Sequence, residues 1–167
     1  MRGEWEALST SLSLSWRKID VESKNFKILL VEDDPDHTHL IKRELKKSGV
    51  TNTIDWVEDG DEAIRYLEGA GDYSVDNVSS LGLILLDIKL PKMTGIEVLE
   101  WIKKNDETKE IPVVMLTTSS DIKDIEKSYS LGANLYVEKS VENFVKRIKN
   151  IGLYCQYLYS KKDEQEA

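Results

Sequence analysis

The sequence predicts an α/β domain in which a parallel sheet is covered by helices on both faces. From Phe26 onward, short apolar segments alternate strictly with amphipathic segments, which gives five predicted strands and five predicted helices. The segment at 81–87, "LGLILLD", is apolar up to its last residue, which is typical of a strand buried on both faces. The chain has 167 residues, of which 40% are hydrophobic and 32% charged, so it suits one domain of this class.

The predicted strands are short apolar segments, and each is followed by a polar turn. They lie at 26–32, 52–58, 81–87, 111–117 and 134–139. The connection between the second helix and the third strand, "GAGDYSVDNVSS", is polar and long for a compact domain, and we interpret it as a loop.

The predicted helices begin at recognisable caps. Asp34 is the expected N-cap of a helix with Pro35 in its first position, and Asp59 caps the next helix. "TGIE" at 94–97 is a capping box, in which Thr and Glu side chains bond to each other's backbone N–H groups. The fourth helix covers 121–130, and the last is expected to start near Ser140.

Composition and charge exclude several classes of function. The net charge of −8 leaves no basic surface for nucleic acid or for an anionic membrane. The single cysteine, Cys155, cannot form an internal disulfide, which suits a reducing compartment. The chain has no apolar segment long enough to span a bilayer and no signal-peptide pattern, so we expect a cytoplasmic protein.

Five chemically suitable residues end four of the predicted strands. Glu32 and Asp33 end the first strand, Asp87 the third, Thr117 the fourth and Lys139 the fifth. In an open parallel sheet, ligands bind beyond the carboxyl ends of the strands. Clustered carboxylates repel one another unless a cation lies among them, and Mg²⁺ prefers oxygen ligands. Asp87 is the natural nucleophile for a phosphoryl group, whose oxygens the hydroxyl and the ammonium would contact.

Each of these residues taken singly has an ordinary interpretation. An acid at a strand end is more often a solvated loop residue or a helix cap, and a lysine is more often a surface residue. Chance is a poor explanation for all of them together. His37 and His39 point to different faces of a helix, so they are not expected to form a metal pair. Trp56 and Trp101 are most simply core or half-buried residues.

Four segments resemble the response-regulator receiver domain of two-component signalling. They are "ILLVEDDP", "LILLDIKLPKMTG", "VVMLTTSS" and "GANLYVEKS". The resemblance covers 26–150, and it leaves 1–25 as an N-terminal extension and 151–167 as a helix extension with a polar tail. The resemblance implies the flavodoxin-like strand order 2-1-3-4-5. No helix-turn-helix module fits after Asn150, so we do not expect a DNA-binding regulator.

The resemblance also implies a role for each candidate residue. Asp87 would accept a phosphoryl group from a phosphohistidine of a sensor histidine kinase. Mg²⁺ would be bound by the carboxylates of Asp33, Asp87 and, through water, Glu32, and by the backbone carbonyl of Lys89. Thr117 and Lys139 would contact the phosphoryl oxygens, and Tyr136 would be the switch aromatic that turns inward when Thr117 moves. By itself, Tyr136 is more simply a half-buried strand aromatic.

Three further features refine this hypothesis. The family usually has proline after the lysine, in a cis bond; here Ser140 follows, so we expect either a trans bond with a shifted loop or a strained cis bond. The polar connection and the Thr117–Thr118 pair resemble small regulators paired with bacterial phytochromes. An apolar seam along the last helix, which either packs on the sheet or forms a homodimer or kinase contact, consists of Phe144, Ile148, Ile151, Cys155 and Leu158.

Two rival functions compete with this prediction. A pseudo-receiver scaffold would bind partners without phosphorylation, but it would have no need of the complete acid, hydroxyl and lysine set. A phosphatase with an aspartyl-phosphate intermediate would want a second Asp two residues after the nucleophile, where this chain has Lys89. The favoured prediction is therefore a signalling phosphoprotein that catalyses its own phosphorylation and dephosphorylation and is not a metabolic enzyme.

Overall fold

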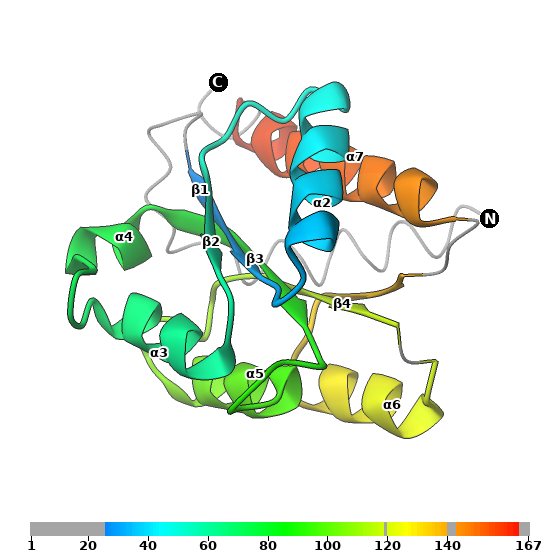
Figure 1. The fold of residues 1–167 in the computed structure, drawn as a ribbon. Helices are drawn as coiled ribbons and strands as arrows, with labels where there is room; N and C mark the ends of the chain where they lie inside the picture. The colour runs from blue at the N-terminus through cyan, green and yellow to red at the C-terminus, as the bar shows by residue number, and fades with distance from the viewer. Residues whose placement is uncertain (1–25, 119, 140–142, 164–167) are drawn as a thin grey trace.

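A computed structural model of the chain describes residues 26–118, 120–139 and 143–163 (Figure 1). The predicted N-terminal extension at 1–25 and the Lys139–Ser140 bond lie outside these residues, so both expectations stay predictions. Among the described residues, no helix combines the length and the apolar composition needed to cross a bilayer.

The sheet has five parallel strands in the order β2-β1-β3-β4-β5. This confirms both the predicted fold class and the strand order that the resemblance implied. The strands are β1 (Lys27–Val31), β2 (Ile54–Val57), β3 (Leu81–Asp87), β4 (Val113–Thr117) and β5 (Leu135–Glu138). The central strand β3 is buried along its whole length, as its composition predicted.

Six helices are present among the described residues, one more than predicted. They are α2 (Pro35–Lys47), α3 (Gly60–Glu68), α4 (Val75–Ser79), α5 (Gly95–Lys104), α6 (Ile122–Ser130) and α7 (Phe144–Asp163). The caps agree with the sequence: the Asp34 side chain accepts from the first turn of α2, and Thr94 and Glu97 form the capping box of α5. The last helix begins at Phe144, later than the expected start near Ser140.

The additional helix, α4, lies in the polar connection that the sequence analysis interpreted as a loop. Ser74 caps it by accepting a hydrogen bond from the Asp76 N–H. Gly69 ends α3 in the left-handed conformation, with φ 64°, and turns the chain back so that α4 packs beside α3. Lys27 at the start of β1 reaches α4 through a 3.1 Å bond from Nζ to Asn77 Oδ1.

Two hydrophobic clusters lie on opposite faces of the sheet. On one face, α2 and α7 cover the strands, and on the other α3, α5 and α6 do so (Figure 1). The helices thus leave the carboxyl edge of the strands open to the loops that carry the candidate residues.

Candidate functional site

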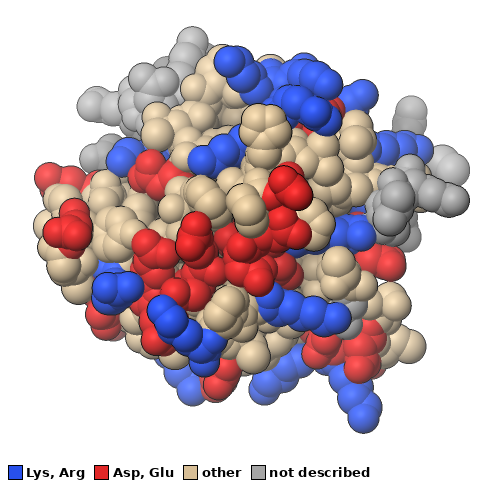
Figure 2. All heavy atoms as spheres, viewed as in Figure 1, with Lys and Arg blue, Asp and Glu red and all other residues tan. Residues whose placement is uncertain are grey.

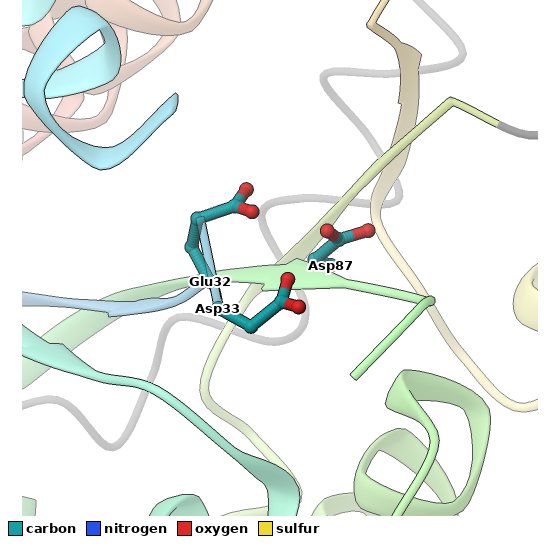
Figure 3. A group of neighbouring side chains, drawn as sticks. All are labelled: Glu32, Asp33 and Asp87. Atoms are coloured by element: carbon teal, nitrogen blue, oxygen red, sulfur yellow. The ribbon is translucent and has the colours of Figure 1, made fainter. Parts of the chain in front are cut away.

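Three carboxylates meet beyond the ends of β1 and β3. One oxygen from each of Glu32, Asp33 and Asp87 lies within 4.8 Å of the others (Figure 3). This follows from the sheet, because β1 and β3 are parallel neighbours with Val31 opposite Leu86, so both strands end at the same level. Three hard oxygen donors at this separation fit a divalent cation such as Mg²⁺ or Mn²⁺.

Lys139 lies between two of these carboxylates. Its ammonium donates to Glu32 Oε2 and, at 2.9 Å, to Asp87 Oδ2. All three side chains are withdrawn from water, with Lys139 3%, Glu32 1% and Asp87 8% exposed. A buried charge needs a partner of opposite sign, so the lysine offsets the repulsion between the acids.

The backbone around Lys139 is held by two neighbouring elements. Its own N–H donates to the carbonyl of Thr117, at the end of β4, over 2.6 Å. Arg147 of α7 donates from Nη1 to the carbonyl of Glu138 over 3.0 Å. Both bonds fix the chain at the point where Lys139 leaves the sheet.

Glu32 is the most enclosed of the acids. Burial raises the pKa of its carboxyl group, although the bond from Lys139 acts in the opposite direction. The N–H of Asp34 donates to Glu32 Oε1 over 3.2 Å, which places the side chain against the start of α2. Asp33, in contrast, is exposed and faces solvent.

The remaining predicted residues lie around the same edge. Thr117 is buried at the end of β4, next to β3. Tyr136 lies on β5, opposite Met115, and is half-buried, as expected of an ordinary strand aromatic. The Lys89 N–H donates to Asp87 Oδ1 over 3.3 Å, so the residue lies beside the candidate nucleophile. The roles of all three residues stay predictions.

The loop after Asp87 is held close to the strand by a glycine. A Cβ atom on Gly95 would lie 2.0 Å from the Asp87 carbonyl oxygen, so no other residue fits without displacement. The loop is also joined to the β2–α3 turn, because Lys92 Nζ lies 2.6 Å from Asp59 Oδ2. Lys92 has a φ of 66°, an uncommon value for a residue with a side chain.

Sequence reasoning missed the position of His37. Its Nδ1 lies 3.5 Å from Glu32 Oε1 and 3.5 Å from Lys139 Nζ, and its ring packs against Phe144 of α7. From the sequence, His37 was considered only as half of a metal-binding pair with His39. Its position in the first turn of α2, just after Glu32 and Asp33 at the end of β1, could have indicated that it lies near the site.

The surface around the site is acidic. Figure 2 shows Asp and Glu side chains gathered near the middle of the face that Figure 1 presents, with Lys and Arg side chains above and below them. Such a surface attracts cations from solution and repels anions, including a negatively charged phosphodonor.

The sequence and the fold are both similar to those of known regulators. Residues 28–149 match the response regulator receiver domain. The chain is 40% identical over 134 residues to the probable methanogenesis regulatory protein FilR2 of Methanothrix harundinacea, a match covering 77% of this chain and 83% of FilR2. It is 43% identical over 113 residues to the response regulator Rcp1 of Synechocystis, covering 68% and 76% of the two chains.

Two solved structures have the same fold. The phosphorylated cyanobacterial phytochrome response regulator RcpA matches with a TM-score of 0.70 and 43% identity, over 76% of this chain and 91% of its own. The Mn²⁺-bound form of response regulator Rcp1 matches with a TM-score of 0.70 and 40% identity, over 75% and 91%. The matched segment contains every candidate residue from Glu32 to Lys139, and the chain belongs to the response regulator receiver domain family.

Proposed function

We propose that this chain is a response regulator that accepts a phosphoryl group on Asp87. The observation that carries the proposal is the grouping of the carboxylates of Glu32, Asp33 and Asp87, two of which, Glu32 and Asp87, bond to the Lys139 ammonium. This arrangement supports phosphoryl transfer, because the reaction needs a carboxylate nucleophile and concentrated positive charge at one point.

The proposed reaction moves one phosphoryl group between two residues. A carboxylate oxygen of Asp87 attacks the phosphorus of a phosphohistidine, the P–N bond breaks, and the imidazole leaves with the bonding electron pair and takes up a proton. Lys139, already 2.9 Å from Asp87 Oδ2, holds a positive charge where negative charge collects on the phosphoryl oxygens. Thr117 at the end of β4 would donate its hydroxyl hydrogen to another of these oxygens.

We propose Mg²⁺ as the cation of this site. Asp33, Asp87, Glu32 through water, and the backbone carbonyl of Lys89 would bind it. The bound ion would offset negative charge on the transferred group. The Mn²⁺-bound form of Rcp1 supports a divalent metal, since the two ions share a preference for oxygen ligands.

The proposed donor is a sensor histidine kinase of the phytochrome type. The support is the similarity to RcpA, which is a cyanobacterial phytochrome response regulator. Hydrolysis of the aspartyl phosphate would end the signal, so the chain would react only with its own phosphoryl group and would not turn over a metabolite.

The proposed output is a change in partner binding or in dimerisation. Tyr136 would report the phosphorylated state by turning inward beside Thr117, and α7 would supply a homodimer contact. Phe144, Ile148 and Ile151 are buried against the sheet, so the first half of the apolar seam belongs to the core. The side chains of Cys155 and Leu158, the second half of the seam, lie outside the part of the chain that the structure describes, so their contact stays a prediction. Leu153, which is not part of the seam, is exposed on α7.

The test is an intact-mass measurement after incubation with Mg²⁺ and acetyl phosphate. Wild-type protein should gain the mass of one phosphoryl group, and an Asp87→Asn variant should gain none. Glu100→Gln, which removes a half-exposed acid on α5 that pairs with Lys104, is the matched control and should phosphorylate normally. Wild-type protein that binds Mg²⁺ but gains no mass from several donors would favour the scaffold alternative.

A further inference from the structure

We propose that Trp56 is a positioning residue that holds the Glu32–Asp33 pair in its metal-binding arrangement. This inference rests on the proposed function, because it names the group that pre-organises two of the proposed ligands. Trp56 lies on the edge strand β2, opposite Leu30 of β1, and β1 separates it from β3, the strand that ends at Asp87.

The end of β2 binds both backbone groups of Glu32. The Glu32 N–H donates to the carbonyl of Val57 over 3.1 Å, which continues the ladder between β1 and β2 by one residue. The Glu32 carbonyl accepts from the indole Nε1 of Trp56 over 2.7 Å. The second bond is the unusual one, because a side chain of one strand fixes the peptide plane just beyond the end of its neighbour.

That peptide plane joins the two acids. The carbonyl of Glu32 and the N–H of Asp33 belong to the same rigid unit, so a bond to the carbonyl restricts the direction in which both side chains leave the backbone. Glu32 must point inward to Lys139 while Asp33 stays exposed, and their carboxylates must still meet Asp87. A rotation of this unit would separate the ligands.

The indole itself is held from two sides. Its ring is half-buried against the hydrophobic cluster under α2 and α7, which includes Ile41 and Leu45. Lys42 of α2 places Nζ 5.6 Å from the ring centroid. A cation over the ring face is attracted to it and also draws electron density from the indole, which strengthens the N–H as a donor. The indole N–H is therefore held in position toward the Glu32 carbonyl.

The inference is tested with variants that remove the N–H and keep an aromatic ring. Trp56→Phe is the simple change, and replacement of Trp56 by 3-benzothienylalanine preserves the indole shape with sulfur in place of N–H. Trp101→Phe is the matched control, because Trp101 is half-buried on α5 against the opposite hydrophobic cluster. Mn²⁺ binding is followed by loss of the free-ion electron paramagnetic resonance signal, and thermal unfolding is recorded in EDTA.

We expect Mn²⁺ to bind about fivefold more weakly to both Trp56 variants, the factor that corresponds to one hydrogen bond of about 1 kcal/mol. Trp101→Phe should bind as wild type does. If Trp56 only supported the fold, its substitution would lower the unfolding temperature and leave the Mn²⁺ affinity of the folded protein unchanged. Wild-type affinity in the benzothienylalanine protein would overturn the inference. A wild-type protein that binds no Mn²⁺ would instead overturn the proposed metal site.

Discussion

Replacement of Lys139 by Met should destabilise the metal-free protein far more than the loss of an ordinary ion pair. Lys139 is 3% exposed and pairs with Glu32 and Asp87, both of them buried, so its single positive charge offsets part of their negative charge. Methionine keeps most of the side-chain volume but leaves two buried carboxylates without the ammonium that they share. Breaking a buried pair in this way costs about 3–5 kcal/mol.

The matched control is a lysine that makes an equally short but exposed ion pair. Lys104 Nζ lies 2.7 Å from Glu100 Oε1, and its side chain is 73% exposed. An exposed pair four residues apart on a helix contributes about 0.3–0.5 kcal/mol, so Lys104→Met should change little. The two substitutions are chemically identical; the sites differ in burial and in the number of paired carboxylates, two at Lys139 and one at Lys104.

The assay is thermal unfolding in EDTA, followed by circular dichroism. For a chain of this length, 1 kcal/mol corresponds to about 2–4 °C, so Lys139→Met should lower the midpoint by about 6–20 °C and Lys104→Met by about 2 °C or less. Excess Mg²⁺ should return part of the lost stability, about 2.7 kcal/mol at a hundredfold excess over Kd. Equal midpoints for the two variants would refute the argument that Lys139 offsets the charge of the site.

Three further outcomes are expected. Burial lowers the pKa of Lys103 from 10.5 to about 8, so the unfolded state binds more protons between these values. The stability of wild type relative to Lys103→Met should then rise over that pH range by up to about 3 kcal/mol, and a constant difference in urea titrations would contradict this. Gly95→Ala should reduce both the stability of the protein and its phosphorylation by acetyl phosphate, because the added Cβ would lie 2.0 Å from the Asp87 carbonyl oxygen. Gly71→Ala is the control: it should lower the stability by only about 1 kcal/mol, because of its φ of 69°, and the variant should be phosphorylated normally. Arg147→Gln removes the hydrogen bond to the carbonyl of Glu138, the residue before Lys139. The variant should be phosphorylated more slowly, while its Mg²⁺ affinity, measured by calorimetry, stays unchanged. An equal loss of phosphorylation rate and Mg²⁺ affinity would mean that α7 supports the metal ligands as well.

The strands and the site acids could be predicted because each depends on local chemistry. An apolar segment such as 81–87 can bury both faces only in a central strand, and the order of strands then fixes which ends meet. Asp34 and Thr94 act as caps through bonds to residues two or three positions away, so their role is visible in a short window of sequence.

The features that escaped prediction depend on contacts across the fold. The helix α4 has five residues, too few to show a helical period, and its place depends on the left-handed Gly69 before it. Trp56 was interpreted as a core or half-buried residue, since nothing in the sequence shows that its indole reaches the carbonyl of Glu32. His37 approaches Lys139 across 102 residues of sequence, a distance over which no local pattern operates.

The pairing of α2 with α7 on one face of the sheet has a consequence for synthesis of the chain on the ribosome. The apolar residues of that face, among them Ile28, Leu83 and Val114, lie on strands that are synthesised before α7. The helix that completes their cover starts only at Phe144. Until α7 leaves the ribosomal tunnel, this side of the sheet exposes hydrophobic surface to other chains and to chaperones. A nascent chain that stalls after β5 would therefore carry all its strands and still be prone to aggregate.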